Sequence, residues 1–326
     1  MAGSGRPSSC IILRNFFRTL ILFLTECRSA TVMKGVFFNM KKLLVSLLCL
    51  IMLFPAIASA GTVVTSFYPV WLIALNLTDG IDGIEVRNLA EPATGCLHDY
   101  PLQNSDMVAL SQADVFLING AGMETFLPVI SGAYPDLPVV DASAGISLLE
   151  LEDDGEMNPH IWLDPQRTAD MASNLAEGLI RCFPDHKEQI SANLASYRER
   201  LMALKQTFDD ELQDTVLRKV VIMHEALPYF AEACNLPVSA IIDKEPDDDL
   251  SSARLARILD LFRSENPLPL ILKSEEKDRS VDIIVMETGA SVCELDPVVT
   301  GPADPPLDYY ESVMLRNLHV LLTVMK

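Results

Sequence analysis

Two periods of apolar residues alternate along the chain from Gly61 to the C-terminus. Short runs rich in Val, Ile and Phe have the length of buried strands, and the stretches between them have the three- and four-residue spacing of helices. This alternation predicts parallel sheets with crossover helices, and hence an α/β protein of two tandem lobes. The strands are expected at Val63–Phe67, Glu85–Leu89, Asp114–Asn119 and Pro138–Val140, and then at Lys219–Met223, Val238–Ile242, Leu268–Leu272 and Ser291–Leu295.

The expected helices follow the same division, with an N-terminal lobe over residues 61–184 and a C-terminal lobe over residues 214–326. The first lobe would contain helices at Pro69–Leu77, Leu102–Ser111 and Met123–Ser131, and another beginning near Pro165. The second would contain helices at Ala226–Ala233, Leu250–Arg263, Arg279–Glu287 and Tyr309–Met325.

One long helical pattern, residues 185–213, joins the two lobes. Its apolar residues fall on a single stripe: Ile190, Leu194, Tyr197, Leu201, Leu204, Phe208 and Leu212. We expect this linker helix to pack along both lobes, and a coiled-coil partner is the alternative explanation of the stripe. Asp185 followed by Glu188 predicts an N-terminal capping pair. A continuous helix is stiffer than a flexible linker, so hinging between the lobes should be limited.

The first 60 residues do not belong to this pattern. Met40–Ala60 has a basic start, an apolar run and a small-residue end, which predicts a secretory signal peptide cleaved before Gly61. Residues 1–39 are interpreted as a start-site overextension, and the alternative is an uncleaved membrane anchor. Cys49 lacks the small residues that precede a lipid-modified cysteine, so no lipid anchor is expected. The product should be exported, soluble and periplasmic.

Composition narrows the classes of partner. The chain has 326 residues, of which 49% are hydrophobic, enough for two cores of ordinary size. Its formal net charge of −20 argues against nucleic acids and anionic membranes, which require clustered Lys and Arg. The four cysteines beyond the signal are compatible with disulfides, but their spacing fits no dense disulfide framework; they are Cys96, Cys182, Cys234 and Cys293.

Three of the five histidines share one kind of position. His98, His160 and His224 lie in loops that follow strands or precede helices, and such loops line the ligand crevice of open α/β sheets. Three imidazoles and one carboxylate make a closed site for a divalent cation. By contrast, we expect His186 to be an ordinary surface residue and His319 to be a partly buried packing residue on the last helix.

Catalytic motifs are weak by comparison. His224-Glu225 begins like the His-Glu-x-x-His motif of zinc proteases, but Pro228 stands where the second histidine is needed. Glu225 is the one candidate base for a zinc-dependent hydrolase, which is the alternative from a different class. The sequence contains no Gly-x-Ser-x-Gly elbow, P-loop or Gly-x-Gly-x-x-Gly motif. The acidic runs at 152–154 and 247–249 are interpreted as solvated turns.

Several segments together identify a family resemblance. They are VVTSFYPVW, HDY, ADVFLINGAGMETFL, NPHIWLDP, MHEALPYFAEACNLPV, DKEPDDDLS and METGASVCELDP, in this order from Gly61 to the C-terminus. The chain resembles the periplasmic metal-binding proteins of zinc and manganese ABC importers, most closely the zinc-uptake type. The resemblance implies two α/β lobes, a rigid connecting helix and a metal between the lobes.

The same resemblance implies a ligand set. It places three ligands at His98, His160 and His224, and a fourth, less regular in sequence here, at Asp278. Glu275, Glu276 or a water are the alternatives for that fourth place. Leu97 stands where the family has a proline before its first ligand. Cys96 lies two residues before His98, and its thiolate is a minor alternative ligand.

The resemblance also implies a function without catalysis. The protein would be a receptor, expected to be a monomer, that captures a divalent ion and docks on a membrane permease. Three imidazoles favour Zn²⁺ over Mn²⁺, and a manganese or iron receptor of the same family remains the alternative. A metal-binding adhesin is a further alternative. LEDDGEM stands in place of the long His-rich loop that zinc-specific members often carry. Protons compete for imidazole, so affinity should fall at acid pH.

Overall fold

In the computed structural model of the chain, the described residues are 61–92, 94, 97, 100–150, 155, 157–242, 250–274 and 278–325. The expected signal peptide and the 39 residues before it therefore lie outside the described residues. From Ser59 onward the chain forms one compact unit.

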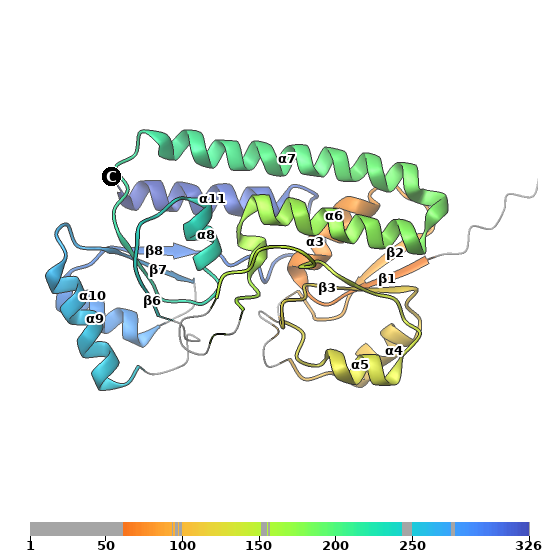
Figure 1. Cartoon of the computed structure of the whole chain (residues 1–326), viewed down its shortest axis with the longest axis horizontal. Helices are drawn as coiled ribbons and strands as arrows, with labels where there is room; N and C mark the ends of the chain where they lie inside the picture. The colour runs from red at the N-terminus through yellow and green to blue at the C-terminus, as the bar shows by residue number, and fades with distance from the viewer. Residues whose placement is uncertain are drawn as a thin grey trace, which may run out of the picture. The chain divides into compact units, whose positions relative to one another are not determined.

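Each lobe is built on a four-stranded parallel sheet, which confirms the predicted α/β fold (Figure 1). The first sheet has the order β2-β1-β3-β4, and the second repeats it as β6-β5-β7-β8. The first-lobe strands are β1 (Gly61–Thr65), β2 (Ile84–Asn88), β3 (Val115–Ile118) and β4 (Val139–Asp141). The second-lobe strands are β5 (Val220–Ile222), β6 (Val238–Ile241), β7 (Leu270–Ser274) and β8 (Val292–Leu295).

This strand order determines where ligands can bind. In each sheet the chain runs outward in opposite directions from two neighbouring strands, β1 and β3 in the first and β5 and β7 in the second. The loops at the carboxyl ends of such a strand pair leave a crevice between them, which is the usual ligand site of open α/β sheets. His224 lies in the loop after β5 and Asp278 in the loop after β7.

The shorter helices are α3 (Tyr68–Thr78), α4 (Asn104–Ser111), α5 (Leu127–Ala133), α8 (Pro228–Ala233), α9 (Ser252–Ser264) and α10 (Arg279–Thr288). Four of them, α4, α5, α8 and α9, start later than predicted. The α5 helix was expected from Met123, but Gly120, Ala121 and Gly122 all have positive φ and form a turn first. The α8 helix begins at Pro228, because proline is favoured in the first helical turn.

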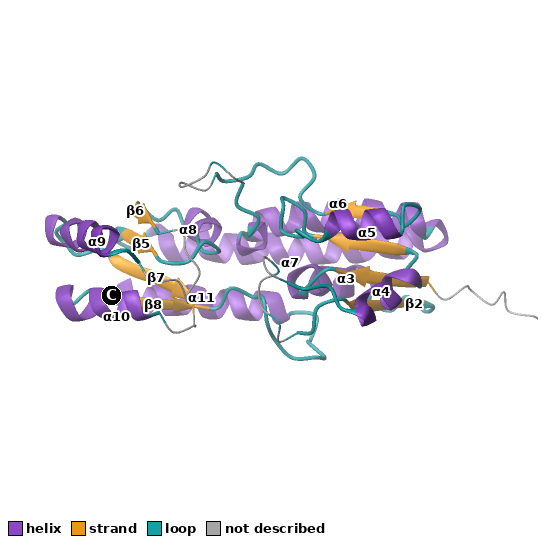
Figure 2. Ribbon diagram, turned by 90° about the horizontal axis from the view of Figure 1, so that it is seen from below, coloured by secondary structure: helices purple, strands orange, loops and turns teal. Residues whose placement is uncertain are grey.

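The three longest helices are α6 (Pro165–Cys182), α7 (Lys187–Gln213) and α11 (Tyr309–Met325). The α7 helix lies alongside α6 over one part of its length and alongside α11 over another (Figures 1 and 2). The predicted apolar stripe of α7 packs inside the chain against α3, α6 and α11, so it needs no coiled-coil partner. The predicted capping pair is wrong. Asp185 lies in a 3₁₀ turn, Pro184–His186, and the N-terminus of α7 has no side-chain cap.

The main hydrophobic core crosses both lobes. One cluster joins residues of β1 and β3 to residues of α6, α7 and α11, and continues to Leu270 and Leu295 in the second sheet. A smaller cluster fills the other face of that second sheet, around Ile271, Ile258 and Phe262. We had expected two cores, one for each lobe. A core shared between the lobes resists their separation, because apolar surface would be exposed to water.

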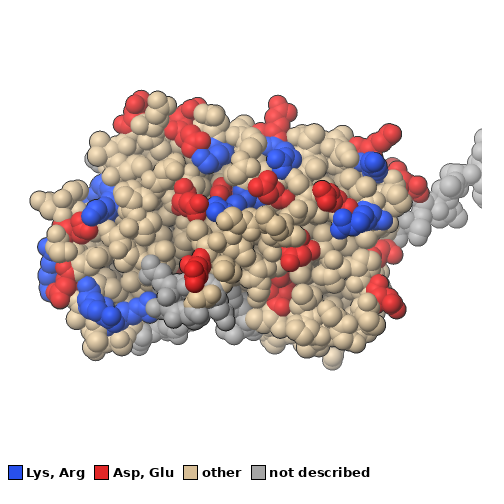
Figure 3. All heavy atoms as spheres, viewed as in Figure 1, with Lys and Arg blue, Asp and Glu red and all other residues tan. Residues whose placement is uncertain are grey.

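Surface and thiol chemistry add little reactivity. On the face shown in Figure 3, Lys and Arg side chains are interspersed with Asp and Glu. Of the cysteines in the described part of the chain, Cys182, Cys234 and Cys293 form no disulfide, and burial raises the pKa of the Cys293 thiol to about 12. Cys96 lies outside that part. No helix within the described ranges has both the length and the apolar character to cross a bilayer.

Candidate metal site

Burial and hydrogen bonds hold the NPHIWLDP segment in place around His160. His160 is fully buried, and the 3₁₀ turn that follows it, Ile161–Leu163, is buried as well. Asp164 then caps α6, since its Oδ1 accepts a hydrogen bond from the Gln166 N–H at 2.8 Å, with Pro165 in the first turn. The helix expected to begin near Pro165 is confirmed.

Asn158 sets the orientation of the His160 ring. Its Oδ1 lies 2.9 Å from His160 Nδ1 and also accepts the backbone N–H of His160. Its Nδ2 donates to the carbonyl of Glu225 at 2.7 Å, so Oδ1 is the atom that faces the ring. The Nδ1 of His160 therefore carries the hydrogen, and a neutral ring presents its lone pair at Nε2. Sequence reasoning missed this role of Asn158, although it lies in the same motif.

The Nε2 of His160 lies 3.3 Å from Oε1 of Glu225. This contact joins a residue of the first lobe to a residue of the second.

His224 has the opposite arrangement of ring nitrogens. It is 3% exposed, and its Nδ1 accepts the backbone N–H of Ala226 at 3.0 Å. The hydrogen of a neutral His224 ring is therefore on Nε2. Binding of a metal through Nε2 requires the other neutral tautomer, with the hydrogen on Nδ1, and Nδ1 can then no longer accept the Ala226 N–H.

Asp278 has a structural role in the loop after β7. Its Oδ1 accepts hydrogen bonds from the N–H groups of Ser280 at 2.8 Å and Val281 at 3.3 Å, which caps α10. The side chain is 6% exposed. A carboxylate that caps a helix stabilises the first turn.

The structure describes only some of the predicted ligand residues. His98 lies outside the described residues, as do Glu275 and Glu276. In the residues described, no three His, Cys, Asp or Glu side chains lie close enough together to hold a metal ion. The ligand set of His98, His160, His224 and Asp278 therefore stays a prediction. His160 and Glu225 are the two residues that the described structure brings together.

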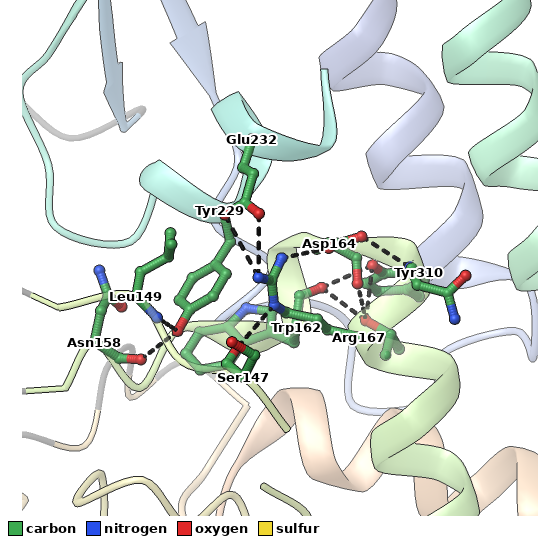
Figure 4. A network of polar contacts seen from close by, with 11 residues as sticks. Ser147, Leu149, Asn158, Trp162, Asp164, Arg167, Tyr229, Glu232 and Tyr310 are labelled. Carbon is green, nitrogen blue, oxygen red and sulfur yellow. Dashed lines mark hydrogen bonds and ion pairs between the residues drawn. The ribbon is translucent and has the colours of Figure 1, made fainter. Parts of the chain in front are cut away.

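Arg167 and Tyr229 take part in further polar contacts between the lobes (Figure 4). Arg167 on α6 bonds to Asp164 Oδ2 at 2.6 Å and to Glu232 on α8 at 3.3 Å, and its guanidinium lies 4.8 Å from the centre of the Tyr229 ring. The Tyr229 hydroxyl donates to the Asn158 carbonyl at 2.7 Å. The α8 helix is thus held against the segment that carries His160.

Glu124 supports the site from the first lobe. Its carboxylate accepts the backbone N–H groups of Asn119 at 2.8 Å and Gly120 at 3.0 Å. The side chain of Asn119 in turn donates to the carbonyl of Pro159 at 2.9 Å, directly before His160. Burial raises the pKa of Glu124 from 4.5 to about 7. The sequence placed Glu124 inside an expected helix and gave no sign of this contact.

The raised pKa of Glu124 predicts a pH dependence of stability. The folded chain holds this proton up to about pH 7 and the unfolded chain only to about pH 4.5. The resulting stabilisation, about 3 kcal/mol, is present below the lower value and is lost as the pH rises through the upper one. Glu124→Gln cannot ionise, so its stability should fall less than that of the wild type between pH 4.5 and 8.

Urea unfolding of the metal-free proteins across this pH range measures the difference. Glu124→Gln also loses one acceptor for the two N–H groups, so it should be the less stable protein at pH 4.5. The control is Glu177→Gln, at an exposed position on α6, which should keep the wild-type slope. Equal slopes for the wild type and Glu124→Gln would contradict the assignment.

The two remaining histidines lie away from the site. His186 is half-buried in the turn before α7. His319 is exposed, so its expected packing role is wrong. The buried face of α11 is formed instead by residues such as Val313, Asn317 and Leu321, and position 319 points away from it.

Comparison with known proteins identifies the family. Residues 63–324 match the family model described as "ZnuA: Zinc-uptake complex component A periplasmic". The zinc-binding lipoprotein AdcA of Streptococcus pneumoniae is 26% identical over 278 residues, which cover 79% of this chain and 54% of that protein. The chain thus spans about half the length of this relative. The manganese-binding lipoprotein MntA of Halalkalibacterium halodurans is 29% identical over 230 residues, covering 69% and 76%.

Solved structures agree with this match. A crystal structure of ZnuA superimposes with a TM-score of 0.69 and 26% identity, covering 82% of this chain and all of that one. The solute-binding protein FpvC of Pseudomonas aeruginosa with Mn²⁺ gives a TM-score of 0.72 at 22% identity and shows the fold alone. The chain therefore belongs to the ZnuA family of zinc-uptake components, whose members are substrate-binding proteins of metal ABC importers and not enzymes.

Proposed function

We propose that this protein captures Zn²⁺ outside the cytoplasm and delivers it to the membrane permease of an ABC importer. The observation that carries the proposal is the buried His160, whose Nδ1 is held by Asn158 and whose Nε2 faces a carboxylate from the other lobe. A metal-binding histidine characteristically donates a hydrogen bond from the N–H of its other ring nitrogen to a polar partner, here Asn158. This bond fixes the tautomer and the ring orientation.

The proposed ligands are His98, His160 and His224 with one carboxylate, for which Asp278 is the candidate from the sequence. Three imidazoles favour Zn²⁺ over Mn²⁺, which prefers oxygen ligands. Among the relatives, AdcA is named for zinc and MntA for manganese, so the family offers both ions. Preference for zinc in this chain rests on the donor set.

Metal capture is proposed to rearrange the site locally. The shared core and the helix α7 oppose wide separation of the lobes. The movement expected on binding is that of the His224 ring, which must exchange its contact with Ala226 for the metal. We further propose a monomer exported by the signal peptide Met40–Ala60, with each lobe contacting one half of the permease.

A titration of the protein from Gly61 onward tests the function. After removal of metal, calorimetry with Zn²⁺ should show one tight site for each chain, and Mn²⁺ should bind more weakly. Zinc affinity should fall as the pH is lowered, because protons compete for the imidazole nitrogens. Absence of zinc binding, or a preference for manganese, would refute the proposal as stated.

A further inference from the structure

Glu225 is not among the ligands that the family resemblance implies. It follows His224 directly at the carboxyl end of β5, and its side chain is 15% exposed. Its Oε1 lies 3.3 Å from Nε2 of the fully buried His160. The two atoms come from different lobes, and each has electron pairs to share with a cation.

The separation of these atoms fits a metal better than a hydrogen bond. A charge-assisted N–H···O bond between an imidazolium and a carboxylate would be about 2.7–2.9 Å long. Two ligand atoms at bond lengths of about 2.0–2.2 Å from a tetrahedral Zn²⁺ stand about 3.3–3.6 Å apart. The observed 3.3 Å therefore matches two neighbouring corners of a zinc coordination sphere.

We propose that Glu225 supplies the carboxylate ligand through Oε1, in place of Asp278. This inference rests on the proposed function. Asp278 uses its Oδ1 to cap α10 through two backbone N–H groups, whereas the Glu225 carboxylate lies against a proposed ligand atom.

Asn158 holds the two proposed ligands, His160 and Glu225, in place before a metal binds. Its Oδ1 holds the His160 ring, and its Nδ2 holds the backbone carbonyl of Glu225. One amide thus fixes both residues relative to each other across the two lobes. A ligand pair held in this way loses less conformational entropy when the metal binds.

The carboxylate also has a consequence for selectivity. One anionic oxygen among three imidazoles leaves a zinc site with a net charge of +1. Because carboxylate oxygen suits manganese and imidazole suits zinc, removing this oxygen should weaken manganese binding more than zinc binding.

The test compares Glu225→Gln with the wild type by zinc and manganese calorimetry. Gln has nearly the same size, and the backbone carbonyl that accepts from Asn158 is unchanged, so the fold should be retained. We expect zinc affinity to fall about 10- to 100-fold or more, the range found when even the partners of ligands are lost. X-ray absorption of the zinc-loaded proteins should show a change in the oxygen and nitrogen shell in Glu225→Gln.

Two control variants make the result specific. Asp260→Asn removes a carboxylate of the same lobe, on α9, that pairs with Arg263, and its zinc affinity should equal that of the wild type. Asp278→Asn should retain zinc binding, since we assign this residue to the helix cap. Thermal unfolding of each metal-free variant measures its fold. If Glu225→Gln does not fold, Glu225→Asp keeps the charge on a shorter side chain and should also bind zinc more weakly.

The outcomes separate the two proposals. If the wild type does not bind zinc, the proposed function fails. If the wild type binds zinc tightly but Glu225→Gln has unchanged affinity and an unchanged X-ray absorption spectrum, only the assignment of Glu225 fails. A loss of affinity in Asp278→Asn without one in Glu225→Gln would return the fourth position to Asp278.

Discussion

Replacement of His160 by alanine is expected to weaken zinc binding by at least about 100-fold, because the site loses a ligand and not only the partner of one. The ring is fully buried, and its Nδ1 is held by Asn158. NPHIWLDP contains no second histidine that could replace it. Calorimetric titration with zinc, in competition with a chelator of known affinity, measures the loss.

The matched control is His319→Ala, because His319 is exposed on α11 and lies outside the proposed site. It should bind zinc like the wild type. His160 also packs against Trp162, with ring centres 5.1 Å apart, so the stability of metal-free His160→Ala must be measured as well. If folded His160→Ala retains wild-type affinity, the site assignment is wrong.

Replacement of Trp162 by alanine is expected to lower the free energy of unfolding by about 3–5 kcal/mol, the usual cost of removing a large aromatic side chain from a core. Trp162 is fully buried and contacts the Phe67 ring edge to face at 5.1 Å. Its Nε1 donates to the carbonyl of Pro297 at 2.8 Å, in the second lobe. Urea unfolding followed by circular dichroism measures the loss.

Trp71→Ala provides the comparison, since Trp71 is the other tryptophan of the chain and is only partly buried. Its destabilisation should be the smaller of the two. Trp162→Ala should also weaken zinc binding, because the indole ring packs against His160. A loss of stability no greater than that of Trp71→Ala would show that Trp162 does not join the lobes as described.

The elements of the fold could be predicted because their signals are local. The expected strands match the observed ones to within about two residues, and the last helix has the bounds Tyr309–Met325 in both. The errors occur where a local pattern competes with a turn. Residues 123–126 belong to a stretch with helical spacing of apolar residues. The positive φ angles at 120–122 and the hydrogen bonds of the buried Glu124 carboxylate hold them in a loop instead.

The site could be predicted less completely, because its contacts join residues far apart in sequence. His160 and His224 were found from their loop positions and the family resemblance. Asn158 and Arg167 were not, and Glu225 was considered only as the base of a hydrolase. Nothing near these residues in the chain shows that they take part in contacts between the two lobes. Asp278 came from the family resemblance; the structure shows it as the cap of α10, and its role as a ligand stays a prediction.

The hydrophobic cluster shared by both lobes has a consequence for how the importer would recognise a loaded receptor. A partner can distinguish two states of a protein only through contacts that differ between them. Because one hydrophobic core joins the two lobes, the metal-free and metal-loaded receptors cannot differ by a wide opening and closing of the lobes. On the proposed function, the permease must therefore recognise the metal-loaded state through the conformation of the loops around β5, β7 and the His160 segment.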